Sequence, residues 1–243
     1  MRLFVLLLFL SLPLHASNVV HLTSLDWPPY SSKSLAGQGV SVEVARQAFK
    51  AMGYELKVDF FPWSRTVKLA SDTNSKYSGY FPEYFSEEGA NTFIFSEPMG
   101  TGPLGFMENS AKRITWNTLN DLTRYRIGVV QDYVNTTDFD AKVADGSLKA
   151  IAVTSDKQNV LKVGTGRIDL AVIDSNVLSH MLNRDKSLAK VKSKVVMNNK
   201  LLVNKQLHIA FKRTPEGKKL AEIFNQGLKK IDVDAIMKTG LSQ

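Results

Sequence analysis

The chain alternates short strand-like segments with amphipathic helix-like segments, and this alternation constrains its fold more than any other feature. In residues 55–61, Leu56, Val58 and Phe60 alternate with polar neighbours, which is typical of a strand. Residues 44–52 instead carry apolar side chains at helical spacing, and the pattern stops at Gly53. Further strands are expected at residues 21–25, 126–130, 149–153 and 170–173. Repeated strand–helix units of this size predict an α/β fold with largely parallel sheets.

Two later helices carry clear start signals. Thr214 and Pro215 suit the first positions of a helix, and apolar residues from Leu220 to Ile231 then fall on one face. Ser155 and Gln158 have the spacing of a capping box, which predicts that another helix starts there.

The first sixteen residues match a secretory signal peptide. Arg2 supplies a positive charge, residues 3–14 are apolar except at Ser11 and Pro13, and residues 14–16 offer a small-residue cleavage site. The apolar stretch is too short to remain as a spanning helix. The alternative is an N-terminal core helix. We expect cleavage near Ala16 and a chain that works in a bacterial periplasm.

The absence of cysteine narrows the chemistry of the chain. With 0 cysteines it has no disulfide, no thiolate metal site, no catalytic thiol and no lipidated cysteine, so we expect a protein without a membrane anchor. The net charge is +8, but the basic residues are spread along the chain, and export removes the usual nucleic-acid partner. We therefore expect no nucleic-acid binding.

Two other site signals can be set aside. His21, His180 and His208 are scattered without the spacing of metal ligands, so neither a metal nor another cofactor is expected. Residues 100–105 match a GxGxxG pattern, but they contain a proline and do not open a helix. Dinucleotide binding needs a strand, a tight turn and a helix N-terminus in that order, so this segment is better interpreted as a crossing between domains.

Six motifs occur in a familiar order along the chain. They are Trp27-Pro28-Pro29-Tyr30, Gly39-Val40, Phe95-Ser96-Glu97-Pro98, residues 119–128, residues 166–174 and residues 207–211. Together they resemble the bacterial extracellular solute-binding proteins of family 3, the periplasmic receptors of polar amino-acid ABC importers. The resemblance covers essentially the whole chain after residue 16.

This resemblance implies a two-lobed type II periplasmic-binding-protein fold in which each lobe is a mostly parallel sheet flanked by helices. By the motifs, lobe 1 would hold residues 17–107 and 206–243, and lobe 2 would hold residues 108–205. The resemblance also implies a monomer that captures a small polar solute in the cleft between the lobes and docks on an inner-membrane ABC permease or a membrane sensor.

The chain departs from the family at the site for the solute carboxylate. The family's arginine, six residues before the Phe-Ser-Asp/Glu-Pro motif, corresponds to Gly89, and its second-lobe Gly-Thr-Thr corresponds to residues 132–134. A bidentate guanidinium is the strong way to fix a carboxylate, and no nearby residue replaces it. This departure argues against ordinary α-amino-acid recognition.

Aromatic and acidic residues remain as candidate ligand contacts. Trp27 stands where the family places an aromatic ring over the ligand. Further aromatic walls are expected from Tyr30, Trp63, Tyr80, Tyr84 and Tyr133. Their alternative role is packing in the core.

Three carboxylates are expected near these rings. They are Glu83, Asp132 and Asp174, and Asp174 matches the family's cleft aspartate at the end of a strand. Aromatic faces with carboxylates favour a cationic or amine-bearing solute. Arg65 has two interpretations: it replaces the missing arginine and returns an acidic or zwitterionic solute to contention, or it forms a surface salt bridge.

Three functions follow from the resemblance. The first, which we expect, is a non-enzymatic receptor that delivers an amino-acid-like or amine-bearing solute to an ABC importer. The second is the ligand-sensing subunit of a membrane-bound signalling protein. The third is a periplasmic dehydratase-type enzyme in which Glu83 acts as general acid.

Overall fold

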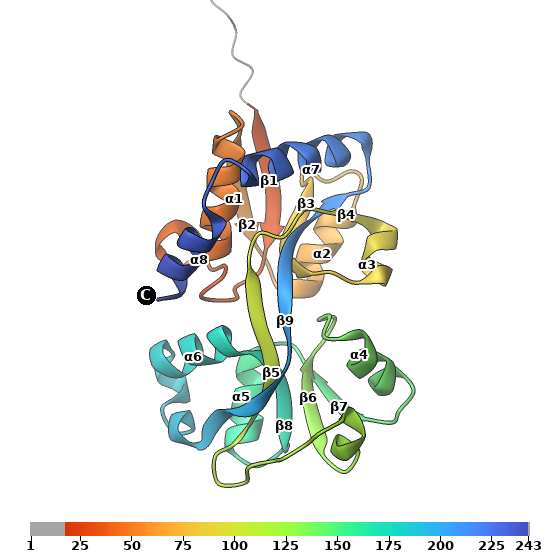
Figure 1. The fold of residues 1–243 in the computed structure, drawn as a ribbon, viewed down its shortest axis with the longest axis vertical. Coiled ribbons are helices and arrows are strands. Elements are labelled where there is room, and N and C mark those ends of the chain that lie inside the picture. The colour runs from red at the N-terminus through yellow and green to blue at the C-terminus, as the bar shows by residue number, and fades with distance from the viewer. Residues whose placement is uncertain (1–17, 243) are drawn as a thin grey trace, which may run out of the picture.

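The computed structural model describes residues 18–242, so the predicted signal peptide lies outside the described residues. Figure 1 shows the elements in two groups, an upper half and a lower half, joined by two long strands. The upper half contains β1 (Val19–Ser24), η1 (Ala36–Gln38), α1 (Val40–Lys50), β2 (Glu55–Phe60), α2 (Trp63–Ser71), β3 (Gly79–Tyr84), α3 (Glu87–Thr92), β4 (Phe93–Phe95), α7 (Pro215–Leu228) and α8 (Val233–Leu241). The lower half contains η2 (Leu119–Leu122), β6 (Arg126–Val130), α4 (Thr137–Ala144), β7 (Lys149–Val153), α5 (Asp156–Gly164), β8 (Leu170–Asp174), α6 (Ser175–Arg184), η3 (Lys186–Leu188) and η4 (Lys192–Lys194).

The joining strands are β5 (Thr101–Asn109) and β9 (Val195–Lys212). They run antiparallel to each other from Thr101–Gln206 to Asn109–Val195, and β9 then continues into the upper half to pair with β3 and β4. The strand order is β2-β1-β3-β9-β5-β8-β6-β7, with β4 also on β9. The two halves therefore share one continuous hydrogen-bonded sheet.

The expected α/β architecture is confirmed, with one addition. Within each half the strands pair in parallel, β1 with β2 and β3, and β6 with β7 and β8. Two predicted strands match β6 and β7 to the residue. The antiparallel strands β5 and β9 were not predicted, apart from the interpretation of residues 100–105 as a crossing.

The helix-end signals gave mixed results. Thr214 caps α7 by accepting a hydrogen bond from the Gly217 N–H at 3.1 Å, with Pro215 in the first turn as predicted. Helix α5 starts where expected, but the predicted capping box is wrong: the Ser155 side chain makes no capping hydrogen bond, and Gln158 donates to the Thr154 hydroxyl instead.

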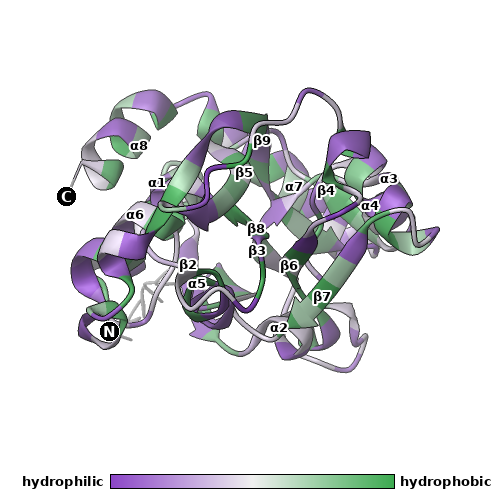
Figure 2. Cartoon of the chain, turned by 90° about the horizontal axis from the view of Figure 1, so that it is seen from below, coloured by the Kyte–Doolittle hydropathy of each residue, from purple (hydrophilic) through white to green (hydrophobic). Residues whose placement is uncertain are grey.

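Each half has its own aromatic core. In the upper half, Phe49 on α1 lies 5.2 Å from Phe224 on α7, ring centre to ring centre, and both are fully buried. In the lower half, Phe106 on β5 packs on Trp116 and on Phe139. Figure 2 shows hydrophobic residues on the inner strands β6 and β8, while the surrounding helices mix hydrophilic and hydrophobic residues. Burial of these apolar faces fixes the helices on the sheet.

Within residues 18–242, no helix combines the length and hydrophobicity that crossing a bilayer requires.

Candidate ligand-binding site

Asp174 stands at the end of β8, where the lower half meets the upper half. It caps α6: its Oδ1 accepts hydrogen bonds from the backbone N–H of Asn176 at 2.8 Å and of Val177 at 3.2 Å. The carboxyl ends of parallel strands are where α/β proteins place ligand contacts. The Asp174 side chain is 1 % exposed, and burial raises its pKa to about 6 although the hydrogen bonds oppose the rise.

Tyr30 reaches Asp174 from the upper half. Its hydroxyl lies 3.2 Å from Oδ1 and 3.1 Å from Oδ2, and it accepts a hydrogen bond from the Asn176 side-chain amide at 2.8 Å. The Tyr84 hydroxyl, also from the upper half, lies 3.4 Å from Oδ2. These contacts form a buried polar cluster between the halves, with Tyr30 and Tyr84 from the upper half and Asp174 and Asn176 from the lower half.

A tight turn holds Trp27 against Tyr30. The Trp27 N–H donates to the Ser31 carbonyl at 2.6 Å, and the Ser31 N–H returns a hydrogen bond to the Trp27 carbonyl at 3.1 Å. The turn stacks the two rings at 4.6 Å between centroids and 24° between planes. The Tyr84 ring meets Trp27 edge-on at 6.0 Å. One face of Trp27 is therefore covered by Tyr30, and the three rings form one wall.

Asp156, at the start of α5, is a second buried carboxylate in this region. Burial and repulsion from Asp174 raise its pKa to about 7, and the neighbouring Trp27 indole and Tyr133 hydroxyl oppose the rise. The Trp27 Nε1–H itself has no hydrogen-bond partner in the described chain although it is buried. A buried unpaired donor costs free energy, so this edge of the cluster is incomplete within the protein.

Glu83 on β3 is the third buried carboxylate. A register irregularity between Tyr80 and Glu83 in the β3–β9 pairing allows the two side chains to meet, although residues three apart in a regular strand point to opposite faces. The Tyr80 hydroxyl donates to Oε2 at 2.8 Å, and the Tyr84 N–H donates to Oε1 at 2.7 Å. Burial raises the Glu83 pKa to about 7, against these hydrogen bonds and the charge of Lys205.

Lys205 on β9 is the cation close to these acids. Its side chain is half-buried, its Nζ lies 5.3 Å from the centre of the Tyr84 ring, and it donates to the Phe85 carbonyl at 3.4 Å. Burial lowers the pKa of Lys205, opposed by the charges of Asp140 and Glu83. None of the three buried carboxylates forms an ion pair with any Lys, Arg or His in residues 18–242.

A second aromatic group lies beside Glu83. The Trp63 ring meets Tyr80 and Tyr133 edge-on, each at 5.5 Å. Tyr133 belongs to the lower half, and its hydroxyl is close enough to Asp156 and Glu83 for both to raise its pKa, after burial itself. Tyr133 therefore links the two acidic regions.

Asp132 and Arg65 take positions outside the buried cluster. Asp132 is exposed and joins the halves at the surface: its carbonyl accepts from Trp63 Nε1 at 2.8 Å, and its Oδ2 accepts from the Ser64 hydroxyl at 2.7 Å. Arg65 is exposed, and its guanidinium lies over the Phe61 ring at 4.9 Å. The structure does not bring Arg65 to the other candidates. It brings together Trp27, Tyr30, Trp63, Tyr80, Glu83, Tyr84, Tyr133 and Asp174.

Gly102 on β5 makes room for the Asp174 cluster. A Cβ at this position would collide with Asp174 Oδ2 and would lie 2.9 Å from the Tyr30 hydroxyl and 3.2 Å from the Tyr84 hydroxyl. Only glycine lets strand β5 approach these three groups so closely.

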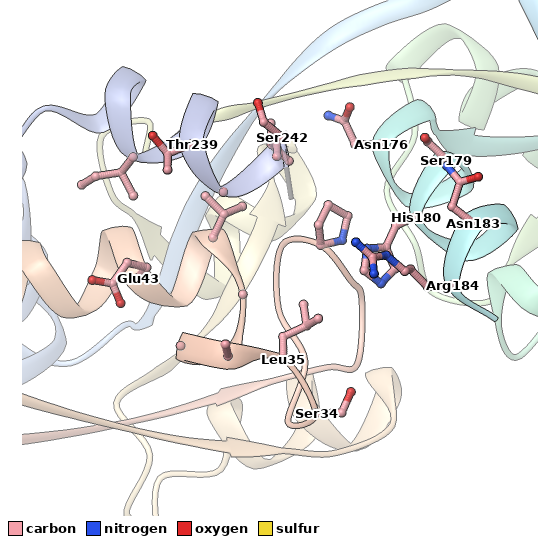
Figure 3. A pocket seen from close by; sticks show the side chains of 18 of the residues that line it. Ser34, Leu35, Glu43, Asn176, Ser179, His180, Asn183, Arg184, Thr239 and Ser242 are labelled. Carbon is pink, nitrogen blue, oxygen red and sulfur yellow. The ribbon is translucent and has the colours of Figure 1, made fainter.

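A large open cavity lies between the two halves (Figure 3). It measures about 1320 Å³ and lies between η1, α1 and α8 of the upper half and α6 of the lower half. Asn176 and Pro29 line it, and these residues are next to Asp174 and Tyr30. The cavity is therefore bounded by both halves, while Tyr30 and Asp174 themselves are buried and do not line it.

Sequence reasoning missed Asp156 and Lys205. Asp156 could have been found, because it follows the strand at residues 149–153 and the carboxyl ends of parallel strands share one edge of a sheet. Lys205 lies within β9, which was not predicted. Within residues 18–242, no group of three His, Cys, Asp or Glu side chains is arranged to hold a metal ion.

No family model matches the chain, and no curated protein is recognisably related to it by sequence. Solved structures do match. A histidine kinase sensor domain with similarity to periplasmic binding proteins superposes with a TM-score of 0.78 at 16% identity, covering 92% of this chain and 96% of that one. An amino-acid ABC transporter substrate-binding protein from Streptococcus pneumoniae, bound to L-arginine, gives 0.73 at 14% identity over 93% and 95%. An ancestral amino-acid-binding protein, a precursor of cyclohexadienyl dehydratase, gives 0.70 at 18% identity over 93% and 94%.

These comparisons define the class of fold. The chain has the type II periplasmic-binding-protein fold, and its structural neighbours are mostly binding proteins.

Proposed function

We propose that the chain is a periplasmic receptor that captures a small polar solute, amino-acid-like or amine-bearing, between its two halves. The observation that carries this proposal is the buried group in which Tyr30 and Tyr84 of the upper half meet Asp174 of the lower half. Aromatic rings and carboxylates from both halves would surround a solute there and remove it from water.

Capture would use hinge motion without covalent chemistry. The expected lobes are residues 17–107 with 206–243 and residues 108–205, but residues 104–108 pair with β8 and Phe106 packs in the lower core, so the segment from Leu104 would move with the lower lobe. The crossings in β5 and β9 would act as the hinge. In the open form the cleft is wet, and the solute binds first to Trp27 and its neighbours. Closure then brings Asp174 to the solute, so ligand shifts an open–closed equilibrium by its higher affinity for the closed form. The closed form would deliver the solute to an inner-membrane ABC permease.

A thermal-shift screen of residues 17–243 tests this function. The screen would contain amino acids, polyamines, betaines, small peptides, organic acids and sugars. A solute at a hundred times its dissociation constant stabilises the fold by about 2.7 kcal/mol, which is visible as a raised melting temperature. A solute that raises the melting temperature of the wild type but not of the Asp174→Asn variant supports the receptor function. The absence of a shift with every solute of the screen argues against it.

Sensing is a second candidate, because a histidine kinase sensor domain shares the fold at a TM-score of 0.78. The partner distinguishes the two functions. Loss of solute uptake on deletion of the gene supports transport, whereas unchanged uptake with a lost transcriptional response supports sensing.

A dehydratase-type activity is a third candidate. Burial holds the pKa of Glu83 at about 7, in the range of a general acid, and a dehydratase precursor shares the fold. Turnover of a candidate solute by the chain and its loss in Glu83→Gln would support catalysis; binding without turnover supports the receptor.

A further inference from the structure

The buried cluster has more negative charge than the protein itself neutralises. Glu83 and Asp156 are each 7 % exposed and Asp174 is 1 % exposed, yet none of them forms an ion pair in the described chain. One nearby cation, Lys205, faces Glu83 from β9. When all three acids are ionised, two negative charges stay unpaired, which is costly in a buried site.

The surroundings of these acids suit ammonium groups. The rings of Trp27, Tyr30 and Tyr84 lie at Asp174, and those of Tyr80 and Trp63 lie at Glu83. Aromatic faces attract cations, and a carboxylate forms charge-assisted hydrogen bonds with an ammonium.

The edge of the cluster at Asp156 is left unfinished by the protein. Trp27 is 7 % exposed, and its buried Nε1–H lies close enough to Asp156 to lower the pKa of that carboxyl, but no described residue accepts from it within hydrogen-bond geometry. Asp156 is thus a buried acid with an unpaired donor beside it and no cation to neutralise it. A solute ammonium placed there would supply the missing charge and would hold the carboxylate in place for the indole N–H.

The charge of the cluster is unfavourable for a solute carboxylate. Arg65, the arginine that the sequence offered for this role, lies outside the cluster over Phe61. A solute carboxylate would have Lys205 as its cationic partner and would face three buried acids.

Building on the receptor function proposed above, we propose that the solute carries two ammonium groups and no carboxylate, as in a short alkane diamine. One ammonium binds at Glu83 and Tyr80, and the other binds between Asp156 and Asp174. Tyr133, which is close to both Asp156 and Glu83, lies along the alkyl chain.

Three four-carbon probes distinguish the contribution of each charged group of the solute to binding. Isothermal titration calorimetry at pH 8 would compare 1,4-diaminobutane, 1-aminobutane and 4-aminobutanoate with residues 17–243. The diamine should bind at least roughly tenfold more tightly than the monoamine, on the scale of one charge-assisted hydrogen bond, and the amino acid should not bind measurably. Diamines of two to six carbons would then define the spacing between the two ammonium sites.

Matched variants locate one of the two ammonium sites. Glu83→Gln keeps the side-chain shape and should reduce diamine affinity to near that of the monoamine, while monoamine affinity changes little. Glu88→Gln, the same change on an exposed residue five positions along, should leave both affinities unchanged. An equal loss for both amines in Glu83→Gln would overturn the two-site arrangement.

Failure of this inference is distinguishable from failure of the receptor function. Tighter binding of L-arginine or of another carboxylate-bearing solute than of any diamine overturns the dicationic ligand and leaves the receptor standing. If no diamine and no solute of the wider screen binds, both the dicationic ligand and the receptor function are contradicted.

Discussion

The hydroxyl of Tyr30 lies 3.1 Å from Oδ2 of Asp174, although the two residues are 144 positions apart and belong to opposite halves of the molecule. Burial and the charge of Asp174 raise the pKa of Tyr30, so the hydroxyl stays protonated and donates to the carboxylate. This hydrogen bond exists only while the halves are together. It therefore contributes to closure without adding to the stability of either half alone.

Removing this hydroxyl should open the ligand-free protein. Tyr30→Phe leaves the stacked ring in place but removes one donor to Asp174, a hydrogen bond to a charged group worth about 1.5–3 kcal/mol. Small-angle X-ray scattering should report a larger radius of gyration for the variant than for the wild type. Tyr77→Phe is the control, because the Tyr77 hydroxyl binds Asp59 within the upper half at 2.9 Å. Equal radii for Tyr30→Phe and wild type would show that this contact does not hold the halves together.

Closure should also depend on pH. The closed-form pKa values are about 7 for Glu83 and Asp156 and about 6 for Asp174, above the ordinary range of carboxyl groups in water. The closed form thus binds more protons than an open, hydrated form between about pH 4 and pH 7, and closure weakens as pH rises through this window. The other charged or titratable groups that face these acids are Tyr30, Tyr80, Tyr84, Tyr133 and Lys205.

Scattering profiles of the ligand-free chain at pH 5 and pH 8 check this dependence. The radius of gyration should be larger at pH 8, and Glu83→Gln should reduce the difference because it cannot ionise. A radius that is the same at both pH values would contradict the prediction. Binding of a cationic solute near pH 6.5 should release protons, since the solute favours the ionised acids; calorimetry in two buffers of different ionisation enthalpy measures this release.

The close approach of β5 to Asp174 predicts an unusually harmful small substitution. Gly102→Ala would push a methyl group into Asp174 and the Tyr30 hydroxyl, both of which are fixed by other hydrogen bonds, so the halves should be unable to close fully. Solute affinity should fall at least roughly tenfold. Gly105→Ala on the same strand is the control, because the nearest atoms to its methyl group would be the flexible ends of Leu201 and Met197, near 3.0 and 3.2 Å, with the Leu201 Cα at an ordinary 3.4 Å. Similar affinities for the two variants would mean that the clash at Gly102 is relieved elsewhere.

The local elements of the fold were predictable because they depend on neighbouring residues. Residues 126–130 and 149–153 were expected to be strands, and they match β6 and β7 to the residue. Strand β9 was not predicted, since it runs through both halves and its middle, residues 198–206, mixes polar with apolar residues and lacks a consistent burial pattern. Its assignment depends on pairing with β5, which is a contact between distant segments.

The residues of the candidate site also differ in whether the sequence alone predicts their positions. Asp174 could be placed from the end of its strand, because the end of a parallel strand is a local property. The exposed position of Arg65 could not be predicted from the sequence. Arg65 and the buried Thr66 are adjacent on α2, and only the packing of that helix decides which side chain faces inward. Sequence also could not show that Tyr30 covers one face of Trp27.

The contact of the uncovered face and edge of Trp27 with the solute should contribute to the binding free energy. Trp27→Ala removes a stacking or cation–π contact and its burial, and should weaken solute binding by about 1–3 kcal/mol. Trp116→Phe, a change in the lower core away from the cluster, controls for general loss of packing. Calorimetry with the best solute measures both. Unchanged affinity in Trp27→Ala would remove this residue from the site.

Lys205 gives the sharpest test of the charge of the solute. Lys205→Met keeps the length of the side chain and removes a positive charge close to Glu83. For a dicationic solute this change removes repulsion, so affinity should rise several-fold to roughly tenfold, on the scale of one charge interaction near a protein surface. A solute whose carboxylate rests on Lys205 would instead bind more weakly. Arg65→Ala removes an equal charge on the exposed face of α2 and should leave affinity unchanged. The sign of the Lys205→Met effect, measured by calorimetry at low ionic strength, thus distinguishes a solute held by its cations from one held by a carboxylate.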